Sequence, residues 1–156
     1  MTVEIERRFL LADDSWREVA DEPLVLQQGY LSVEKERTIR VRIIGSQAWL
    51  TLKGYISDMT RSEFEYEIPL AHAQAMMADM CPFKVEKYRY RVEFEGFVYE
   101  IDEYFGDNAP LIVAEIELPS EDTEFPKPSW LGKEITADGK FTNAYLSKHP
   151  YSSWTE

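Results

Sequence analysis

Charged residues alternate along several segments that have strand character, and this pattern constrains the fold more than any other feature of the chain. The segment Glu4-Ile5-Glu6-Arg7-Arg8 shows it most clearly. Side chains two residues apart point to the same side of an extended strand, so Glu4, Glu6 and Arg8 share one face. Later segments repeat the arrangement with Arg40/Arg42, Arg61/Glu63/Glu65, Lys87/Arg89, Glu100/Asp102 and Glu115/Glu117. Together these rows predict a charged interior.

Eight segments have the alternation and the β-branched or aromatic content of strands. They are Val3–Phe9, Gln27–Val33, Arg37–Ile44, Ala48–Gly54, Arg61–Ile68, Val85–Glu95, Phe97–Tyr104 and Ile112–Leu118. Glu95-Gly96 and Ile44-Gly45-Ser46 each join two of them closely enough for a hairpin, so the sheet should be mostly antiparallel. Helices are expected from Asp13/Asp14-Ser15 to Ala20, over Leu70–Met80, after Pro119-Ser120 and from Thr142-Asn143 to Lys148.

Composition limits the class of protein. A chain of 156 residues with 44% hydrophobic content predicts a single domain over residues 1–156. No apolar run approaches the roughly 20 residues of a membrane helix, and the acidic start does not resemble a signal peptide, so we expect a cytoplasmic protein. Cys81 is the only cysteine, which excludes an internal disulfide and a Cys-based metal site. The net charge of −12 argues against nucleic acid and anionic membranes as partners.

The alternation alone also fits a half-exposed sheet with its charged face toward water. Residue chemistry favours a charged interior, because arginine and glutamate dominate these positions and lysine is confined to Lys53 and Lys87. Arginine recognises phosphate oxygens with two parallel hydrogen bonds, and carboxylates are ligands for Mg²⁺ or Mn²⁺. Eight strands can close into a barrel that holds one small ligand. Dry burial of so many charges would cost several kcal/mol per ion, so the interior should hold water, metal and an anionic ligand.

These segments resemble the CYTH superfamily, whose members are also called triphosphate tunnel metalloenzymes. Glu4-Ile5-Glu6-Arg7-Arg8-Phe9 is similar to the E-x-E-x-K signature of that family, with arginine in place of the usual lysine. The resemblance continues at Gln28-Gly29-Tyr30-Leu31, Arg40-Val41-Arg42, Leu52-Lys53-Gly54, Arg61-Ser62-Glu63-Phe64-Glu65, Lys87-Tyr88-Arg89, Asp102, Glu115-Ile116-Glu117, Gly132-Lys133-Glu134-Ile135-Thr136 and Asn143. The ordered set is far more specific than the opening signature.

The resemblance implies an α+β fold, in which an eight-stranded antiparallel β-barrel forms a tunnel with a charged interior and helices packed outside. It implies two divalent ions, Mg²⁺ or Mn²⁺, bound by Glu4, Glu6, Glu115 and Glu117, with Glu65 and Asp102 as further candidates. The implied phosphate-binding residues are Arg8, Arg40, Arg42, Lys53, Arg61, Lys87 and Arg89. Tyr30 and Lys87 are the candidate catalytic residues. Because Arg8 stays protonated at working pH, it is excluded as a base.

Three functions are compatible with these residues. The first is metal-dependent hydrolysis of inorganic tripolyphosphate, or of longer polyphosphate or nucleoside triphosphates. The second is an adenylate cyclase of the same superfamily, although Glu4 comes too early for the histidine-containing stretch that often precedes the signature in such cyclases. The third is a non-catalytic module that binds polyphosphate or metal, which would gain little from two E-x-E pairs. The substrate is a small polyanion in each case, and either a monomer or a homodimer is compatible with the sequence.

Overall fold

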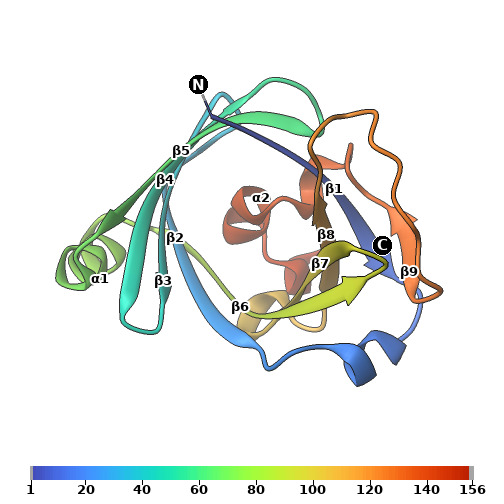
Figure 1. The fold of residues 1–156 in the computed structure, drawn as a ribbon. Helices are drawn as coiled ribbons and strands as arrows, with labels where there is room; N and C mark the ends of the chain where they lie inside the picture. Colours follow the sequence, from blue (N-terminus) through green and yellow to red (C-terminus); the bar gives the residue numbers. More distant parts are fainter. Residues whose placement is uncertain (1, 155–156) are drawn as a thin grey trace.

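Eight antiparallel strands close into a barrel, as the computed structural model of residues 2–154 shows (Figure 1). The strands are β1 (Val3–Leu11), β2 (Leu24–Glu34), β3 (Arg37–Ile44), β4 (Gln47–Tyr55), β5 (Thr60–Ile68), β6 (Phe83–Phe94), β7 (Phe97–Tyr104) and β8 (Ile112–Glu117). They follow the order β5-β4-β3-β2-β6-β7-β8-β1, and β1 also pairs with β5 to complete the ring. The eight predicted strands and the antiparallel barrel are therefore confirmed.

Strand β1 has two neighbours on the same side. Its beginning pairs with β5 through only three residue pairs, among them Glu4 with Arg61. Its end pairs instead with β9 (Leu131–Glu134), a short strand outside the ring that the sequence pattern did not indicate. On its other side, β1 pairs with β8 from Glu6 to Leu10. The first strand thus holds the ring closed and also anchors the carboxyl-terminal part of the chain.

The apolar faces of the strands point away from the barrel interior. Outside β1, β6, β7 and β8, a buried cluster forms around Trp16 and Trp130, which belong to the 3₁₀ helix η1 (Ser15–Val19) and to the segment before β9. Burial of such aromatic side chains stabilises the fold by roughly 2 to 3 kcal/mol each. Two of the three buried clusters therefore lie outside the barrel, which leaves much of the interior free for charged groups.

Helix α1 (Leu70–Asp79) covers the outside of β3 and β4, where Ala73 packs in a buried cluster with Val41 and Ala48. A close approach to the neighbouring β2 requires glycine, because a Cβ atom at Gly29 would lie 2.4 Å from the sulfur of Met77. The outer face of β5 has no such cover, and Tyr66 there is 59% exposed.

Helix α2 (Asn143–Lys148) lies across one end of the barrel, whereas the resemblance implied helices outside it (Figure 1). The position follows from its apolar residue Leu146, which is fully buried with Tyr30, Tyr104 and Val113 from the inner faces of the strands. The hydroxyl of Thr142 accepts a hydrogen bond from the Tyr145 amide and caps the helix, as the sequence indicated.

The remaining connections contain 3₁₀ helices and turns. Three further 3₁₀ helices are η2 (Gly106–Asn108), η3 (Gly139–Phe141) and η4 (Tyr151–Ser153). The prediction of a helix after Pro119-Ser120 is wrong. This segment forms a turn instead, in which the amide of Thr123 donates a hydrogen bond of 3.3 Å to the carbonyl of Ser120. Among residues 2–154, no helix combines the length and apolarity needed to cross a membrane.

Candidate functional site

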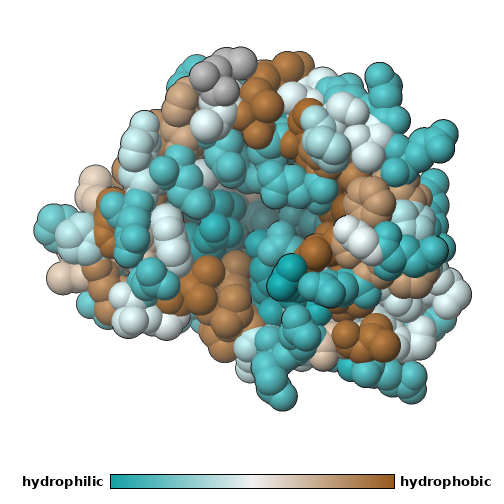
Figure 2. All heavy atoms as spheres, in the orientation of Figure 1, coloured by the Kyte–Doolittle hydropathy of each residue, from teal (hydrophilic) through white to brown (hydrophobic). Residues whose placement is uncertain are grey.

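The barrel encloses a cavity of about 270 Å³, and the space-filling view shows a hollow ringed by hydrophilic side chains (Figure 2). Twelve of the fourteen predicted site residues line this cavity. They are Glu4, Glu6, Arg8, Tyr30, Arg40, Arg42, Lys53, Arg61, Glu65, Arg89, Glu115 and Glu117. The charged rows of different strands therefore converge on one interior space, as the alternation predicted.

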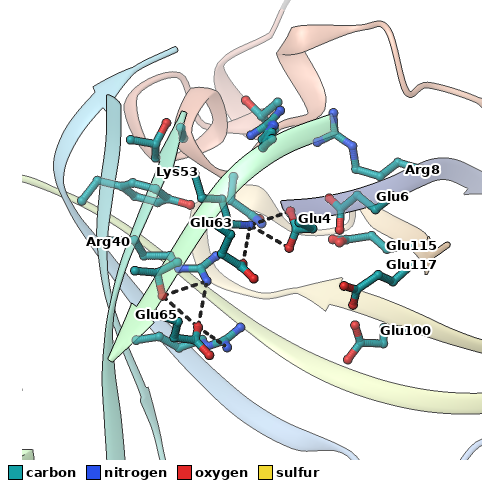
Figure 3. Close-up of a pocket in the computed structure, with 18 of the residues that line it drawn as sticks. Glu4, Glu6, Arg8, Arg40, Lys53, Glu63, Glu65, Glu100, Glu115 and Glu117 are labelled. Atoms are coloured by element: carbon teal, nitrogen blue, oxygen red, sulfur yellow. Dashed lines mark hydrogen bonds and ion pairs between the residues drawn. The ribbon is translucent and has the colours of Figure 1, made fainter. Parts of the chain in front are cut away.

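Carboxylates form one wall of the cavity. Glu6 on β1 pairs in register with Glu117 on β8. Glu115 precedes Glu117 by two residues, so it lies on the same face of β8 (Figure 3). Burial and the negative charges of Glu115 and Glu4 raise the pKa of Glu6 well above its ordinary value. Burial and the charges of Glu4 and Glu100 likewise raise the pKa of Glu117. Carboxyl groups that crowd in this way are stabilised by a cation between them.

Cationic side chains from β3, β4 and β5 form the facing wall. Burial alone would raise the pKa of Glu4, but Lys53 donates hydrogen bonds of 2.9 and 3.1 Å to its oxygens and helps to lower that pKa to about 2. Arg42 donates to Glu65 at 3.2 Å, while burial and the adjacent Arg40 lower the pKa of Arg42 to about 10. Cations packed closely enough to repel one another favour an anionic ligand.

Buried polar atoms in this wall lack partners. Among the described residues, neither amide atom of Gln28 has a hydrogen-bond partner, and the same holds for the Nε atoms of Arg40 and Arg42. Gln28 is paired in register with Arg42, so these groups are neighbours on the inner face. Buried donors are almost always paired in proteins, so this part of the wall is suited to a ligand or water that accepts hydrogen bonds.

Lys87 and Asp102 are the two predicted residues that do not line the cavity. Both are completely buried, and Lys87 donates to Asp102 at 2.7 Å. Asp102 also accepts from Arg89 through hydrogen bonds of 2.8 and 3.0 Å. Arg89 does line the cavity. This geometry makes Asp102 a support that orients Arg89, because its two oxygens are already occupied by cationic donors.

Arg8 and Tyr30 lie toward the end of the barrel that α2 covers. The guanidinium of Arg8 donates to the carbonyls of Phe141 and Thr136 at 3.3 and 3.4 Å. Tyr30 is buried and pairs in register with Arg40, and burial raises the pKa of its hydroxyl. Tyr30 thus remains a protonated hydrogen-bond donor at neutral pH.

Further residues line the cavity that were not predicted as site residues: Thr38, Thr51, Glu63, Glu100, Thr142, Asn143 and Ala144. The alternation already placed Glu63 beside Arg61 and Glu65, and it placed Glu100 beside Asp102, so the pattern held enough information to include both. Thr51 was missed because it is uncharged, yet its hydroxyl donates to Glu65 at 2.9 Å.

The donor set fits a hard divalent cation. Oxygen ligands are the ones that Mg²⁺ and Mn²⁺ prefer, and Glu6, Glu115 and Glu117 supply them from two adjacent strands. Within residues 2–154, no three Asp, Glu, His or Cys side chains already converge closely enough to hold an ion. Small side-chain rotations on the acidic wall would be needed to complete such a site.

An antiparallel barrel with an acidic and a basic wall around one interior cavity defines a class of tunnel-forming β-barrel proteins. The chain belongs to the CYTH family, because the model of the CYTH domain matches residues 2–145.

Relatives of similar length are known. The chain is 40% identical over 157 aligned residues to the inorganic triphosphatase of Acetivibrio thermocellus, and the match covers 100% of both chains. It is 33% identical to the inorganic triphosphatase of Nitrosomonas europaea, over 92% of this chain and 96% of the relative. A crystal structure of an inorganic triphosphatase superimposes with a TM-score of 0.66 at 31% identity, covering 94% of this chain and 95% of the other.

The fold extends to more distant proteins. A putative adenylyl cyclase from Hippeastrum superimposes with a TM-score of 0.57 at 15% identity, covering 77% of this chain and 80% of the other. At that level of identity the likeness concerns the fold alone.

Proposed function

We propose that this protein is a metal-dependent hydrolase that cleaves inorganic tripolyphosphate inside its barrel. The observation that carries the proposal is the division of one interior cavity into a basic wall and an acidic wall (Figure 3). A polyanion needs the first wall, and a divalent cation needs the second. The two curated relatives that are named inorganic triphosphatases support the same activity.

The basic wall binds the substrate. Arg40, Arg42, Lys53 and Arg61 enter the cavity from β3, β4 and β5. Arg89 enters from β6, 3.7 Å from Glu115, so phosphate oxygens can be contacted from several directions. Phosphoryl transfer proceeds through a loose transition state with charge spread over the oxygens, so positioning and electrostatic stabilisation provide most of the catalysis. The unpartnered Nε groups of Arg40 and Arg42 are donors available for this purpose.

The acidic wall holds the metal. Glu6, Glu115 and Glu117 would bind Mg²⁺ or Mn²⁺, and Glu4 would join them when its contact with Lys53 opens. When bound, two such ions supply Lewis acidity to the phosphate oxygens and lower the pKa of a bound water.

Buried residues support this chemistry from behind the wall. Asp102 and Lys87 keep Arg89 extended into the cavity, so both act as positioning residues in this scheme. Tyr30 contributes a protonated hydroxyl that can donate a hydrogen bond to the substrate or orient a water.

The test is phosphate release from tripolyphosphate by the purified protein with Mg²⁺ or Mn²⁺. ATP and thiamine triphosphate serve as comparison substrates, with identification of every product. Glu117→Gln should lower turnover at least 100-fold without a loss of stability, because it removes a metal ligand whose charge neighbouring carboxylates repel. The matched control is Glu93→Gln, which alters a carboxylate that is 71% exposed on β6.

Two outcomes would replace the proposal with another function. Cyclic AMP formed from ATP would identify a cyclase. Saturable binding of tripolyphosphate without turnover, with either metal, would identify a binding module.

A further inference from the structure

One edge of strand β5 has no neighbouring strand over most of its length. Within residues 2–154, β5 pairs with β4 along almost all of one side, but on the other side it pairs with β1 through Thr60–Ser62 alone, and the two strands then diverge (Figure 1). The amide of Glu63 still donates to the carbonyl of Thr2 at 3.0 Å, so the backbone groups of Glu63 point to the β1 side. Because backbone groups alternate in direction along a strand, those of Glu65 and Glu67 point the same way. No other described strand pairs with them, and such an edge is a template for an incoming strand.

The two faces of this open edge, Phe64–Ile68, differ in chemistry. On the outer face of the barrel, beyond the cover that α1 gives to β3 and β4, the side chains of Phe64 and Tyr66 are 41% and 59% exposed. On the inner face the glutamates form a row. In the described part of the chain Glu67 forms no ion pair, and it accepts a hydrogen bond of 3.5 Å from Gln47. The open edge therefore presents an apolar row, an acidic row and unpaired backbone groups together.

Charge argues against a second copy of this chain as the occupant. If two β5 strands paired about Tyr66, Glu65 of one copy would lie opposite Glu67 of the other, and like charges directly opposite each other destabilise a strand pair. Each copy also has a net charge of −12. A strand with lysine or arginine on one face and apolar residues on the other would instead meet both rows with complementary groups.

We propose that the open edge binds an extended basic segment of a partner protein, in which lysine or arginine alternates with large apolar residues. The segment would join the barrel as an antiparallel strand beside β5. Its basic residues would lie opposite Glu65 and Glu67 and exchange backbone hydrogen bonds with them, while its apolar residues would contact Phe64 and Tyr66. The inference does not depend on tripolyphosphate hydrolysis, because it rests on the edge and the outer face of β5.

The test measures binding of the synthetic peptide Lys-Val-Lys-Val-Lys-Val-Lys, labelled with fluorescein, by fluorescence anisotropy. Two matched peptides carry N-methyl groups, one on the lysine amides and the other on the valine amides. Methylation of the lysine amides removes the donors that would face β5, so we expect binding to be lost. Methylation of the valine amides, which would face away from β5, should leave the Kd within about twofold of that of the unmodified peptide.

Variants of the protein locate the binding site. Tyr66→Ser and Glu67→Lys should each raise the Kd of the unmodified peptide about tenfold, because each removes one of the two complementary rows. Their matched controls are Tyr88→Ser and Glu93→Lys, which alter partly or well exposed side chains on β6, a strand with neighbours on both sides. These controls should keep the wild-type Kd for the tyrosine change and lose little affinity for the glutamate change. In the complex, hydrogen exchange followed by NMR should be slower at the amides of Glu65 and Glu67.

Three results would overturn the inference. Equal affinity for the two methylated peptides would show that the peptide is held by charge alone, without strand pairing. Displacement of the peptide by tripolyphosphate would place the peptide inside the cavity. A dimer in sedimentation that Tyr66→Ser dissociates would assign the open edge to a second copy of the chain.

Discussion

Replacement of Asp102 tests whether a completely buried charge cluster supports the phosphate-binding wall. The carboxylate of Asp102 accepts hydrogen bonds from Lys87 at 2.7 Å and from Arg89 at 2.8 and 3.0 Å. Both Asp102 and Lys87 have no exposed surface. Asp102→Ala would leave the ammonium of Lys87 buried without its anion, and it would free the guanidinium of Arg89.

The magnitude follows from the burial. Removal of one partner from a buried ion pair typically lowers the free energy of unfolding by about 3 to 5 kcal/mol. With an m-value of about 2 kcal/mol per molar urea, a loss of about 4 kcal/mol moves the unfolding midpoint down by about 2 M. Asp102→Asn keeps one acceptor oxygen and the side-chain volume, so we expect about half of that loss.

The pH dependence has a defined sign. Burial lowers the pKa of Lys87, and the charge of Asp102 partly counters this effect. In Asp102→Ala the pKa of Lys87 falls further, so the folded variant binds fewer protons than the unfolded chain over a wider range of pH. Stability then rises with pH toward the ordinary lysine value, and the gap between variant and wild type narrows as pH increases.

The assay is urea unfolding at several pH values, followed by tryptophan fluorescence and circular dichroism. Glu93→Ala provides the control, because its contact with Arg91 is 3.4 Å long and both side chains are more than half exposed; we expect a loss below about 1 kcal/mol. The half-saturating metal concentration is measured for Asp102→Asn in parallel. Two results together would falsify the positioning role and make Asp102 a metal ligand. They are a loss of less than about 1 kcal/mol in the free energy of unfolding and a tenfold higher half-saturating metal concentration in Asp102→Asn.

Three further predictions concern the two walls and the outer layer. Because burial and neighbouring carboxylates raise the pKa of Glu6, its ionisation should lower the stability of the metal-free protein as pH rises above 4.5. With a chelator present, Glu6→Gln should therefore be more stable than wild type at pH 7 but not at pH 4. Equal unfolding midpoints of the two proteins at pH 7 would contradict this. Glu4, whose pKa is lowered from 4.5 to about 2, contributes stability above pH 4.5 that is lost as pH falls toward 2. Lys53→Gln should remove about 3 kcal/mol of this contribution to the free energy of unfolding. An acid-unfolding curve equal to that of wild type would refute the role of Lys53 in lowering the pKa of Glu4. Gly29→Ala should lower the free energy of unfolding by about 1 to 3 kcal/mol, because the new Cβ would lie 2.4 Å from the sulfur of Met77; a thermal unfolding midpoint equal to that of wild type would show that α1 shifts freely.

Much of the site followed from period-two alternation. The pattern determines which side chains share a face, and closure of the ring turns those faces into the walls of one cavity. Rows from β1, β3 and β8 therefore met as predicted. Arg8, Arg40 and Glu115 are examples whose side chains line the cavity.

Depth along the barrel was not predictable in the same way. Lys87 and Arg89 share a face, yet only Arg89 reaches the cavity, because Lys87 lies one step closer to the apolar end around Leu146. Alternation predicts which side chains point into the barrel, but it does not predict which end of the barrel interior is filled by apolar side chains. Nor did it reveal β9 or the position of α2, since four to six residues carry too little periodicity to specify a partner.

The short contact between β1 and β5 links assembly of the barrel to assembly of its chemistry. Glu4 and Arg61 are paired in register there, although 57 positions separate them along the chain. This seam has only three residue pairs, and it can close the ring only after the other strands have paired, so we expect it to be among the last contacts to form. Before the seam forms, the arginines of β3 and β5 face water, and the carboxylates of β1 do not yet lie opposite them. A fusion or deletion that disturbs Val3–Ile5 would therefore abolish ring closure and metal binding in a single step.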